Sequence, residues 1–269
     1  VIIAAAKVGG IYANDSMPFD FILENIKIQT NIIELSWLFN VETLIFLGSS
    51  CIYPKFAKQP IKEEYLLTDK LETTNEFYAL AKISGIKLCQ ALKKQHKFNS
   101  ICLMPTNLYG PGDNYNLRNS HVIPALIRKF YDAKEKNLKY VECWGSGKPF
   151  REFLYVDDLA EACLFILEKW SSPNFKKVDN NGEEINWLNV GSPFEISIKD
   201  LTEIISRQIG FKGEIVWDAK MPDGTPRKKL DTTKINDLGW TAQTDLEKGI
   251  KLTIKHFENE ISNSSLRDF

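Results

Sequence analysis

The sequence has few histidines, and its cysteines do not show the spacing of a metal site. It contains three histidines, and none of its five cysteines, at positions 51, 89, 102, 143 and 163, forms a C-x-x-C pair, so we expect no metal. Cys89, Cys102 and Cys163 lie in apolar helical or strand patterns and are interpreted as buried thiols. Free thiols of this kind favour a reducing compartment and predict a cytoplasmic protein.

The chain also has no excess of charge of either sign. Its formal net charge is -1 at pH 7, which gives no general attraction to nucleic acid or to anionic membranes. The apolar opening, residues 1–6, is too short to cross a bilayer and lacks a basic flank with a cleavage site. We therefore expect neither nucleic acid nor membrane as a partner, and any charged ligand must be held by a local cluster of cations.

Hydrophobic periodicity indicates alternating strands and helices, which is typical of an α/β protein. Continuous apolar runs at residues 43–48 and 100–105 predict buried strands, and residues 18–40 and 76–94 carry apolar side chains at helical spacing. A Gly/Asn/Asp-rich loop is expected over residues 111–120. Beyond it, the same reasoning predicts helices over 121–134, 157–170 and 198–209 and from residue 246, and strands over 141–144, 151–155, 187–190 and 214–217.

Ser49, Tyr78 and Lys82 together suggest a proton donor for carbonyl reduction. Ser49 follows the strand at 43–48, at the carboxyl end where open α/β sheets bind ligands. Tyr78 and Lys82 are four residues apart and share a helical face, so the ammonium is expected to lower the pKa of the phenol. By itself the Tyr-x-x-x-Lys spacing often arises by chance, as a half-exposed aromatic beside a solvated charge. The order of strands and helices around it favours catalysis.

Five further segments occur in an order that resembles a known family. They are residues 4–11, 48–55, 119–124, 144–147 and 222–228. With the strand and helix order, they resemble the extended short-chain dehydrogenase/reductase superfamily. Within it they are similar to the GDP-L-fucose synthase family, which has GDP-4-keto-6-deoxy-D-mannose 3,5-epimerase/4-reductase activity. The resemblance covers nearly the whole chain and implies an NADPH-dependent enzyme acting on a GDP-sugar; the preference for NADP over NAD rests on it alone.

One departure from this family concerns the start of the fold. A dinucleotide-binding domain normally opens with a Gly-x-x-Gly-x-x-Gly turn that holds the pyrophosphate. Gly9-Gly10 does not replace it, because the pair lacks the third glycine and the helix spacing. We expect an N-terminally truncated, Rossmann-like, doubly wound parallel sheet with a smaller C-terminal α/β substrate lobe. Residues 1–110, with a later segment near 145–165, would form the remainder of the dinucleotide-binding domain, and residues 111–269 mainly the substrate lobe.

Cys51 and His121 fit the second task of the family, epimerisation at C3 and C5. A C4 ketone acidifies the neighbouring C-H bonds, so a base must remove a proton and an acid must return one to the opposite face. The ordinary pKa values of a thiol and an imidazole, about 8.5 and 6.5, allow a thiolate base beside an imidazolium acid near neutrality. For His121, the alternative is a helix N-terminal residue beside its cap Ser120.

The resemblance also implies binding residues and an assembly. The residues implied to bind the cofactor are Leu47, Gly48, Ser49, Ser50, Lys82, Pro105, Thr106, Asn107, Leu108 and His121. Those expected to bind the GDP-sugar are Lys129, Trp144, Arg151, Arg227 and Lys228; without the family, Lys129 would be interpreted as a solvated helix charge. The helices near 20–39 and 76–94 would pair in a homodimer, or else simply cover the sheet.

Two other functions are compatible with these residues. The chain would be another nucleotide-sugar epimerase or reductase of the same superfamily, with a different division of labour at C3, C4 and C5. Alternatively, because the glycine turn is lacking, it would be a catalytically inactive fragment that only dimerises. Mutation of Cys51 to serine distinguishes the synthase from the first alternative. Loss of C3/C5 proton exchange with retained C4 reduction supports the synthase.

Overall fold

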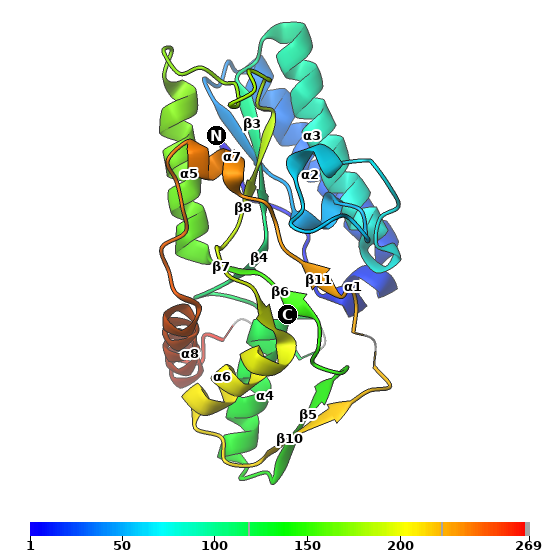
Figure 1. The fold of residues 1–269 in the computed structure, drawn as a ribbon, viewed down its shortest axis with the longest axis vertical. Helices are drawn as coiled ribbons and strands as arrows, with labels where there is room; N and C mark the ends of the chain where they lie inside the picture. The colour runs from blue at the N-terminus through cyan, green and yellow to red at the C-terminus, as the bar shows by residue number, and fades with distance from the viewer. Residues whose placement is uncertain (118, 222, 267–269) are drawn as a thin grey trace.

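The computed structural model describes residues 1–117, 119–221 and 223–266. Arg118 of the predicted loop and Pro222 of the last family segment therefore lie outside the described residues. The chain builds a parallel sheet in the order β1-β2-β3-β8 (Figure 1). Its strands are β1 (Ile2–Ile3), β2 (Leu44–Leu47), β3 (Ser100–Pro105) and β8 (Trp187–Val190). The three strands predicted at 43–48, 100–105 and 187–190 are thus confirmed.

Helices cover both faces of this sheet, as a doubly wound fold requires. The long helices α2 (Pro18–Leu38) and α3 (Glu76–His96) lie on one face, and α5 (Val156–Ser171) lies on the other (Figure 1). Successive side chains of a strand point to opposite faces. Accordingly, Phe46 packs in the core beneath α2 and α3, whereas its neighbour Ile45 packs in the core beneath α5. This double burial explains why the strands are continuously apolar.

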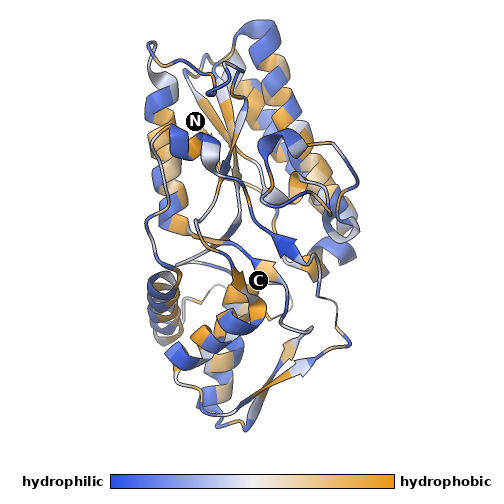
Figure 2. Ribbon diagram, in the orientation of Figure 1, coloured by the Kyte–Doolittle hydropathy of each residue, from blue (hydrophilic) through white to orange (hydrophobic). Residues whose placement is uncertain are grey.

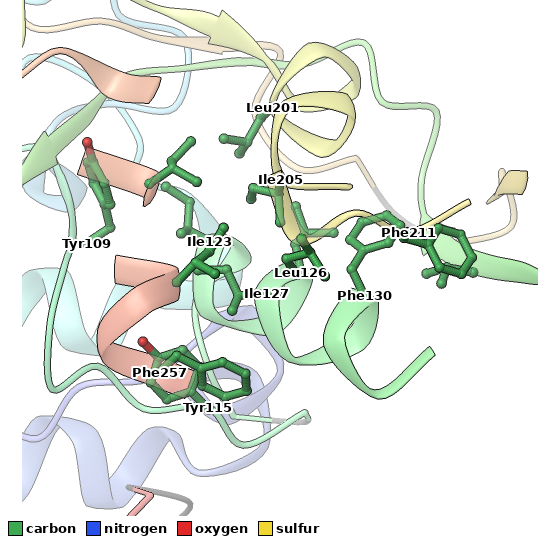
Figure 3. Packing of buried hydrophobic residues seen from close by; sticks show 14 of the residues in the cluster. Tyr109, Tyr115, Ile123, Leu126, Ile127, Phe130, Leu201, Ile205, Phe211 and Phe257 are labelled. Carbon is green, nitrogen blue, oxygen red and sulfur yellow. The ribbon is translucent and has the colours of Figure 1, made fainter. Parts of the chain in front are cut away.

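A second, smaller region follows β4 (Asn107–Tyr109) along the chain. It contains α4 (Val122–Glu135), α6 (Ile198–Ile209) and α8 (Leu246–Ser262), with the strand pair β5 (Tyr140–Trp144) and β10 (Glu214–Asp218). Figure 2 shows that α4 and α6 carry both hydrophobic and hydrophilic residues. Side chains from α4, α6 and α8 interlock in one core, whose centre is drawn in Figure 3.

Short elements connect the two regions and were largely missed by periodicity. The predicted strand 151–155 is two strands, β6 (Phe150–Arg151) and β7 (Phe153–Tyr155), and Glu152 between them is buried in an ion pair. β7 pairs with β4, and β6 pairs with β9 (Ile196–Ser197) and β11 (Arg227–Lys228). The remaining helices are α1 (Ile11–Ser16), α7 (Thr233–Asp237) and three 3-10 turns: Ser50–Ile52, Glu63–Tyr65 and Thr73–Asn75.

None of the helices in the described part of the chain combines the length and apolar character needed to cross a bilayer.

Candidate active site

The site begins where β2 ends and α3 passes over the sheet. Lys82 on α3 is 3% exposed, and its Nζ donates to the carbonyl oxygen of Leu47 at 2.9 Å. The same Nζ lies 5.9 Å from the centre of the Tyr78 ring, one helical turn away. Burial lowers the pKa of Lys82 to about 8. The predicted shared face of Tyr78 and Lys82 is therefore confirmed.

Ser49 and Cys51 follow directly at the carboxyl end of β2. Ser49 is the N-cap of the 3-10 turn Ser50–Ile52, and its Oγ accepts a hydrogen bond from the backbone N-H of Cys51 at 3.2 Å. The phenol of Tyr78 is close enough for a hydrogen bond with Ser49 to lower its pKa and for the Cys51 thiolate to raise it. Hydroxyl, phenol and thiol therefore converge at one strand end.

The expected effect of Lys82 on Tyr78 is wrong for this structure. Burial and the charge of Cys51 together outweigh the hydrogen bond from Ser49, so the pKa of Tyr78 is raised above its ordinary value. The Lys82 ammonium is bonded to the Leu47 carbonyl instead and does not contribute to this shift. In this state the phenol is held protonated, which suits a proton donor.

Lys228 of β11 joins this cluster from the far end of the sequence. Its Nζ lies 3.3 Å from Sγ of Cys51, across 177 residues of chain. Burial alone would raise the pKa of Cys51, but the Lys228 charge and hydrogen bonds with Ser49 and Lys228 leave it lowered. This contact was not predicted, because Lys228 was expected to bind the GDP-sugar.

His121 approaches the same cluster from α4. His121 itself is the N-cap residue of α4, whereas Ser120 was expected to be the cap. Its side chain keeps contact with solvent, yet the surrounding protein and the Lys228 ammonium lower its pKa. That direction favours neutral imidazole, so the expectation of an imidazolium near neutrality is not met in the free protein.

A cavity of about 310 Å³ lies between the two regions of the molecule, beside this cluster. His121 contributes to its wall, and so does Arg151, whose partner in the β6-β11 pair is Lys228. The cavity therefore adjoins the group that contacts Cys51. Predicted residues that line it are Asn107, Leu108, His121, Lys129, Trp144 and Arg151.

Aromatic and cationic side chains form the outer wall of this cavity. Nζ of Lys129 lies 5.4 Å from the ring of Trp144 and donates to the Glu142 carbonyl at 3.1 Å. Trp217 lines the cavity as well and was not predicted. A planar ring surface beside cations suits a ligand that carries both a flat heterocycle and phosphate groups.

A loop over the cavity is fastened by Asp223. Its carboxylate accepts hydrogen bonds from the backbone N-H and the hydroxyl of Ser146, at 2.6 and 2.7 Å. These bonds lower the pKa of Asp223. Gly145 adopts φ +77°, and a Cβ there would collide with the same carboxylate. The residue must therefore be small and conformationally free for the loop to close.

Arg227 is the one predicted cation that the structure does not bring to the site. It pairs through two hydrogen bonds with Glu195, at 2.5 and 2.8 Å, on the exposed side of β11. Neighbouring residues of a strand point to opposite sides, so Lys228 faces Cys51 while Arg227 turns away. That alternation was available in the sequence, but only once residues 227 and 228 are known to form a strand.

The remaining predicted cofactor residues lie along the carboxyl ends of β2 and β3. Gly48 and Ser50 are buried beside Ser49, and Pro105 ends β3. Thr106 and Asn107 both donate to the carbonyl oxygen of Glu152, at 3.3 and 2.9 Å. These bonds tie the β3-β4 junction to the β6-β7 junction, which carries Arg151 into the cavity.

A larger cavity, of about 630 Å³, lies at the carboxyl end of α3 beside the loop that precedes β8. None of the predicted site residues is in its wall, so it does not belong to the catalytic cluster. In the described ranges, no group of three or more His, Cys, Asp or Glu side chains is arranged to hold a metal ion.

Comparisons with known proteins agree with this geometry. The model of the NAD dependent epimerase/dehydratase family matches residues 1–179. A GDP-L-fucose synthase of Sinorhizobium fredii is 53% identical over 263 residues, which are 98% of this chain and 79% of the relative.

Two solved structures are also similar. A GDP-mannoheptose C4 reductase from Campylobacter jejuni with NADP bound has a TM-score of 0.84 and 36% identity, over 96% of this chain and 81% of the other. A GDP-L-fucose synthetase from Naegleria fowleri bound to NADP has a TM-score of 0.81 and 29% identity, over 98% and 78%.

Proposed function

Because the chain belongs to the NAD dependent epimerase/dehydratase family and, within it, to the GDP-L-fucose synthases, we propose that it makes GDP-L-fucose. The reaction converts GDP-4-keto-6-deoxy-D-mannose by epimerisation at C3 and C5 and NADPH-dependent reduction at C4. The observation that supports this most directly is the cluster of Ser49, Cys51 and Tyr78 with Lys228, beside His121. It combines the groups for proton exchange with those for ketone reduction.

Reduction at C4 is assigned to Ser49, Tyr78 and Lys82. Ser49 would donate a hydrogen bond to the C4 carbonyl oxygen, and Tyr78 would give its phenolic proton to the alkoxide that forms there. The raised pKa of Tyr78 keeps that proton on the phenol until negative charge develops on the substrate. Lys82 would hold the ribose of the nucleotide and orient the phenol.

Epimerisation is assigned to Cys51 and His121. The C4 ketone acidifies the hydrogens on C3 and C5, so that a base can take one and leave an enolate. The lowered pKa of Cys51 favours the thiolate as that base. His121, in the wall of the cavity and in contact with solvent, would take up a proton from water and return it to the opposite face of the ring carbon.

The residues present fit a nicotinamide nucleotide, here NADP(H). Lys82 is a nearly fully buried ammonium that, in the described part of the chain, donates a hydrogen bond to one carbonyl. Two further N-H bonds are free for ribose hydroxyls. Asn107 and Leu108 at the start of β4 would line the nicotinamide side, and Leu47, Gly48 and Ser50 would contribute from the carboxyl end of β2. When bound, the reduced nicotinamide supplies the hydride for C4.

Substrate binding is assigned to the cavity. Lys129, Trp144 and Arg151 would hold the GDP moiety, and the planar fork of Arg151 suits diphosphate oxygens. Arg227 is left out of this assignment because it pairs with Glu195. In this scheme residues 1–110, with a later segment near 145–165, belong to the nucleotide-binding domain, and residues 111–269 mainly to the substrate lobe.

The exposed surface of two helices and the free thiols support the proposed assembly and location. Apolar side chains remain exposed on α2 and α3, including Leu35 at 49% and Leu80 at 39%. We assign this face to a homodimer in which the two helices pair with those of a second copy. All five cysteines are free, which suits the cytoplasm.

Two substitutions test the division of labour. Cys51→Ser is expected to abolish deuterium exchange at C3 and C5 of GDP-4-keto-6-deoxy-D-mannose in D₂O and to leave C4 reduction measurable. Tyr78→Phe is expected to slow NADPH oxidation by about 10² to 10⁴-fold while exchange continues. Loss of both activities in each variant would contradict separate roles, and absence of both in the unmodified chain would contradict the proposed function.

A further inference from the structure

A contact between Lys228 and Cys51 joins β11 to the turn that follows β2. Nζ of Lys228 lies 3.3 Å from Sγ of Cys51, and both side chains are partly buried. The other groups that face this sulfur are Ser49, on its own turn, and Tyr78, on α3. The Lys228 ammonium also lowers the pKa of His121, the N-cap residue of α4. Lys228 is thus the only positively charged group acting on Cys51 in the described part of the chain.

The position of Lys228 is fixed by the backbone around it. β11 pairs in parallel with β6, so that Lys228 lies beside Arg151. On the other side, the N-H of Ile61 donates to the Lys229 carbonyl at 2.7 Å, and the N-H of Lys229 donates to Gln59 at 2.8 Å. A lysine held from both sides keeps its ammonium near Cys51, unlike a lysine on a free surface loop.

A buried ion pair strengthens this hold. Lys229 turns inward and lies 3.1 Å from the carboxylate of Glu152, which also accepts a hydrogen bond from the N-H of Leu230 at 2.8 Å. Lys229 directly follows β11, so its buried ion pair fixes the backbone next to Lys228. The residues next to Lys228 and Arg151 therefore anchor these two cations toward the site.

We infer that Lys228 is a positioning residue for proton exchange, which holds Cys51 as the thiolate base, rather than a ligand of the substrate diphosphate. This inference rests on the proposed function for its meaning in catalysis. The same ammonium opposes a second positive charge on His121. Lys228 therefore favours the thiolate form of Cys51 and the neutral form of His121, which gives the two groups different roles.

A comparison of Cys51 with the buried cysteines supports the role inferred for Lys228. The Lys129 charge acts to lower the pKa of Cys143, but burial outweighs it, and burial also raises the pKa of Cys163. For Cys102, a hydrogen bond with Cys89 and burial act in the same direction. Cys51 is the thiol whose pKa is lowered, although it too is surrounded by protein.

The test is the pH dependence of Cys51 alkylation by iodoacetamide in the full chain, without substrate or cofactor. Thiolate is the reactive form. Lys228→Met and Lys228→Gln are expected to raise the apparent pKa and to slow alkylation at pH 7 by about tenfold, one pKa unit. Lys228→Arg should restore most of the rate. Cys51→Ser gives the background from the other four cysteines, which are at most 5% exposed.

A matched control is Lys220→Met, which removes an exposed lysine that does not act on Cys51. An unchanged alkylation profile in both uncharged Lys228 variants would overturn the inference. In that case, a rise in KM for the GDP-sugar alone would indicate that Lys228 binds the substrate diphosphate. Alkylation needs no turnover, so the inference about Lys228 can fail while the proposed function stands. Equally, the proposed function can fail while the inference about Lys228 stands. Using both Met and Gln keeps the test decisive if one variant does not fold.

Discussion

The carboxylate of Glu152, which is 0% exposed, lies 3.1 Å from Nζ of Lys229. Breaking a buried pair of this kind leaves an uncompensated charge and destabilises a protein by about 3 to 5 kcal/mol. Lys229→Met is therefore expected to lower the free energy of unfolding by about that amount, measured by urea denaturation. The double variant Glu152→Gln/Lys229→Met should recover at least about 1 kcal/mol, because neutral Gln can still accept the Leu230 hydrogen bond. Equal losses in the single and double variants would contradict this account.

Glu63 makes the stability of the protein depend on pH. It is 4% exposed, and burial raises its pKa to about 7, although hydrogen bonds such as that from the Asn189 N-H act in the opposite direction. Between about pH 4.5 and 7 the unfolded chain releases this proton while the native protein retains it. Stability from this group therefore falls as pH rises through that range, by up to about 3 kcal/mol.

Glu63→Gln is expected to remove this pH dependence, because the amide does not titrate and still accepts the Asn189 bond. The measurement is urea denaturation at several pH values from 5 to 8. Glu64→Gln, an exposed neighbour, serves as the control and should leave the slope unchanged. If Glu63→Gln keeps the slope of the unmodified protein, the titration belongs to other groups.

Hydrophobic periodicity was sufficient to predict the main strands and helices of the fold. The strand at 187–190 and the helix at 198–209 are observed as predicted, because each is a single apolar run or a regular amphipathic stretch. β11 could not be predicted in this way. It is two residues long, and it is a strand only because β6, more than 70 residues earlier, lies beside it.

The same limit applies to the site. Tyr78 and Lys82 share a helical turn, so their common face follows from spacing alone. The contact of Lys228 with Cys51 joins residues 177 positions apart and depends on strand register. The direction of the Tyr78 pKa was also out of reach, because it depends on burial and on the charge of Cys51.

The bonds between Asp223 and Ser146 are expected to hold the loop in place for substrate binding. Asp223→Ala removes two short hydrogen bonds to Ser146, at 2.6 and 2.7 Å. Both bonds are exposed to solvent, which weakens them relative to buried hydrogen bonds to a charged group, so KM for the GDP-sugar should rise about threefold to tenfold. The rate of Cys51 alkylation should not change, because the thiol lies outside the loop. Asp237→Ala, at the end of α7, is the control.

Trp144 is expected to provide the surface on which a guanine base stacks. It lines the cavity and is 52% exposed, so its ring is open to a ligand. Stacking of a base on an aromatic side chain contributes about 1 to 3 kcal/mol, and Trp144→Ala should weaken GDP binding by about tenfold in calorimetry. Tyr140→Ala is the matched control, because Tyr140 is 57% exposed on the same face of β5 but does not line the cavity. An equal loss in both variants would argue against a specific stacking position.

The proposed homodimer predicts that charge on the outer face of α2 and α3 separates the protomers. Leu35→Glu/Leu80→Glu would bury two pairs of carboxylates in a symmetric interface. The cost of burying unpaired charges should raise the dimer dissociation constant by at least about 100-fold, measured by light scattering after size exclusion. Leu252→Glu replaces a leucine of similar exposure, 41%, on α8 and should leave the mass unchanged. If the double variant keeps the mass of the unmodified chain, the two helices cover the sheet and do not form the interface.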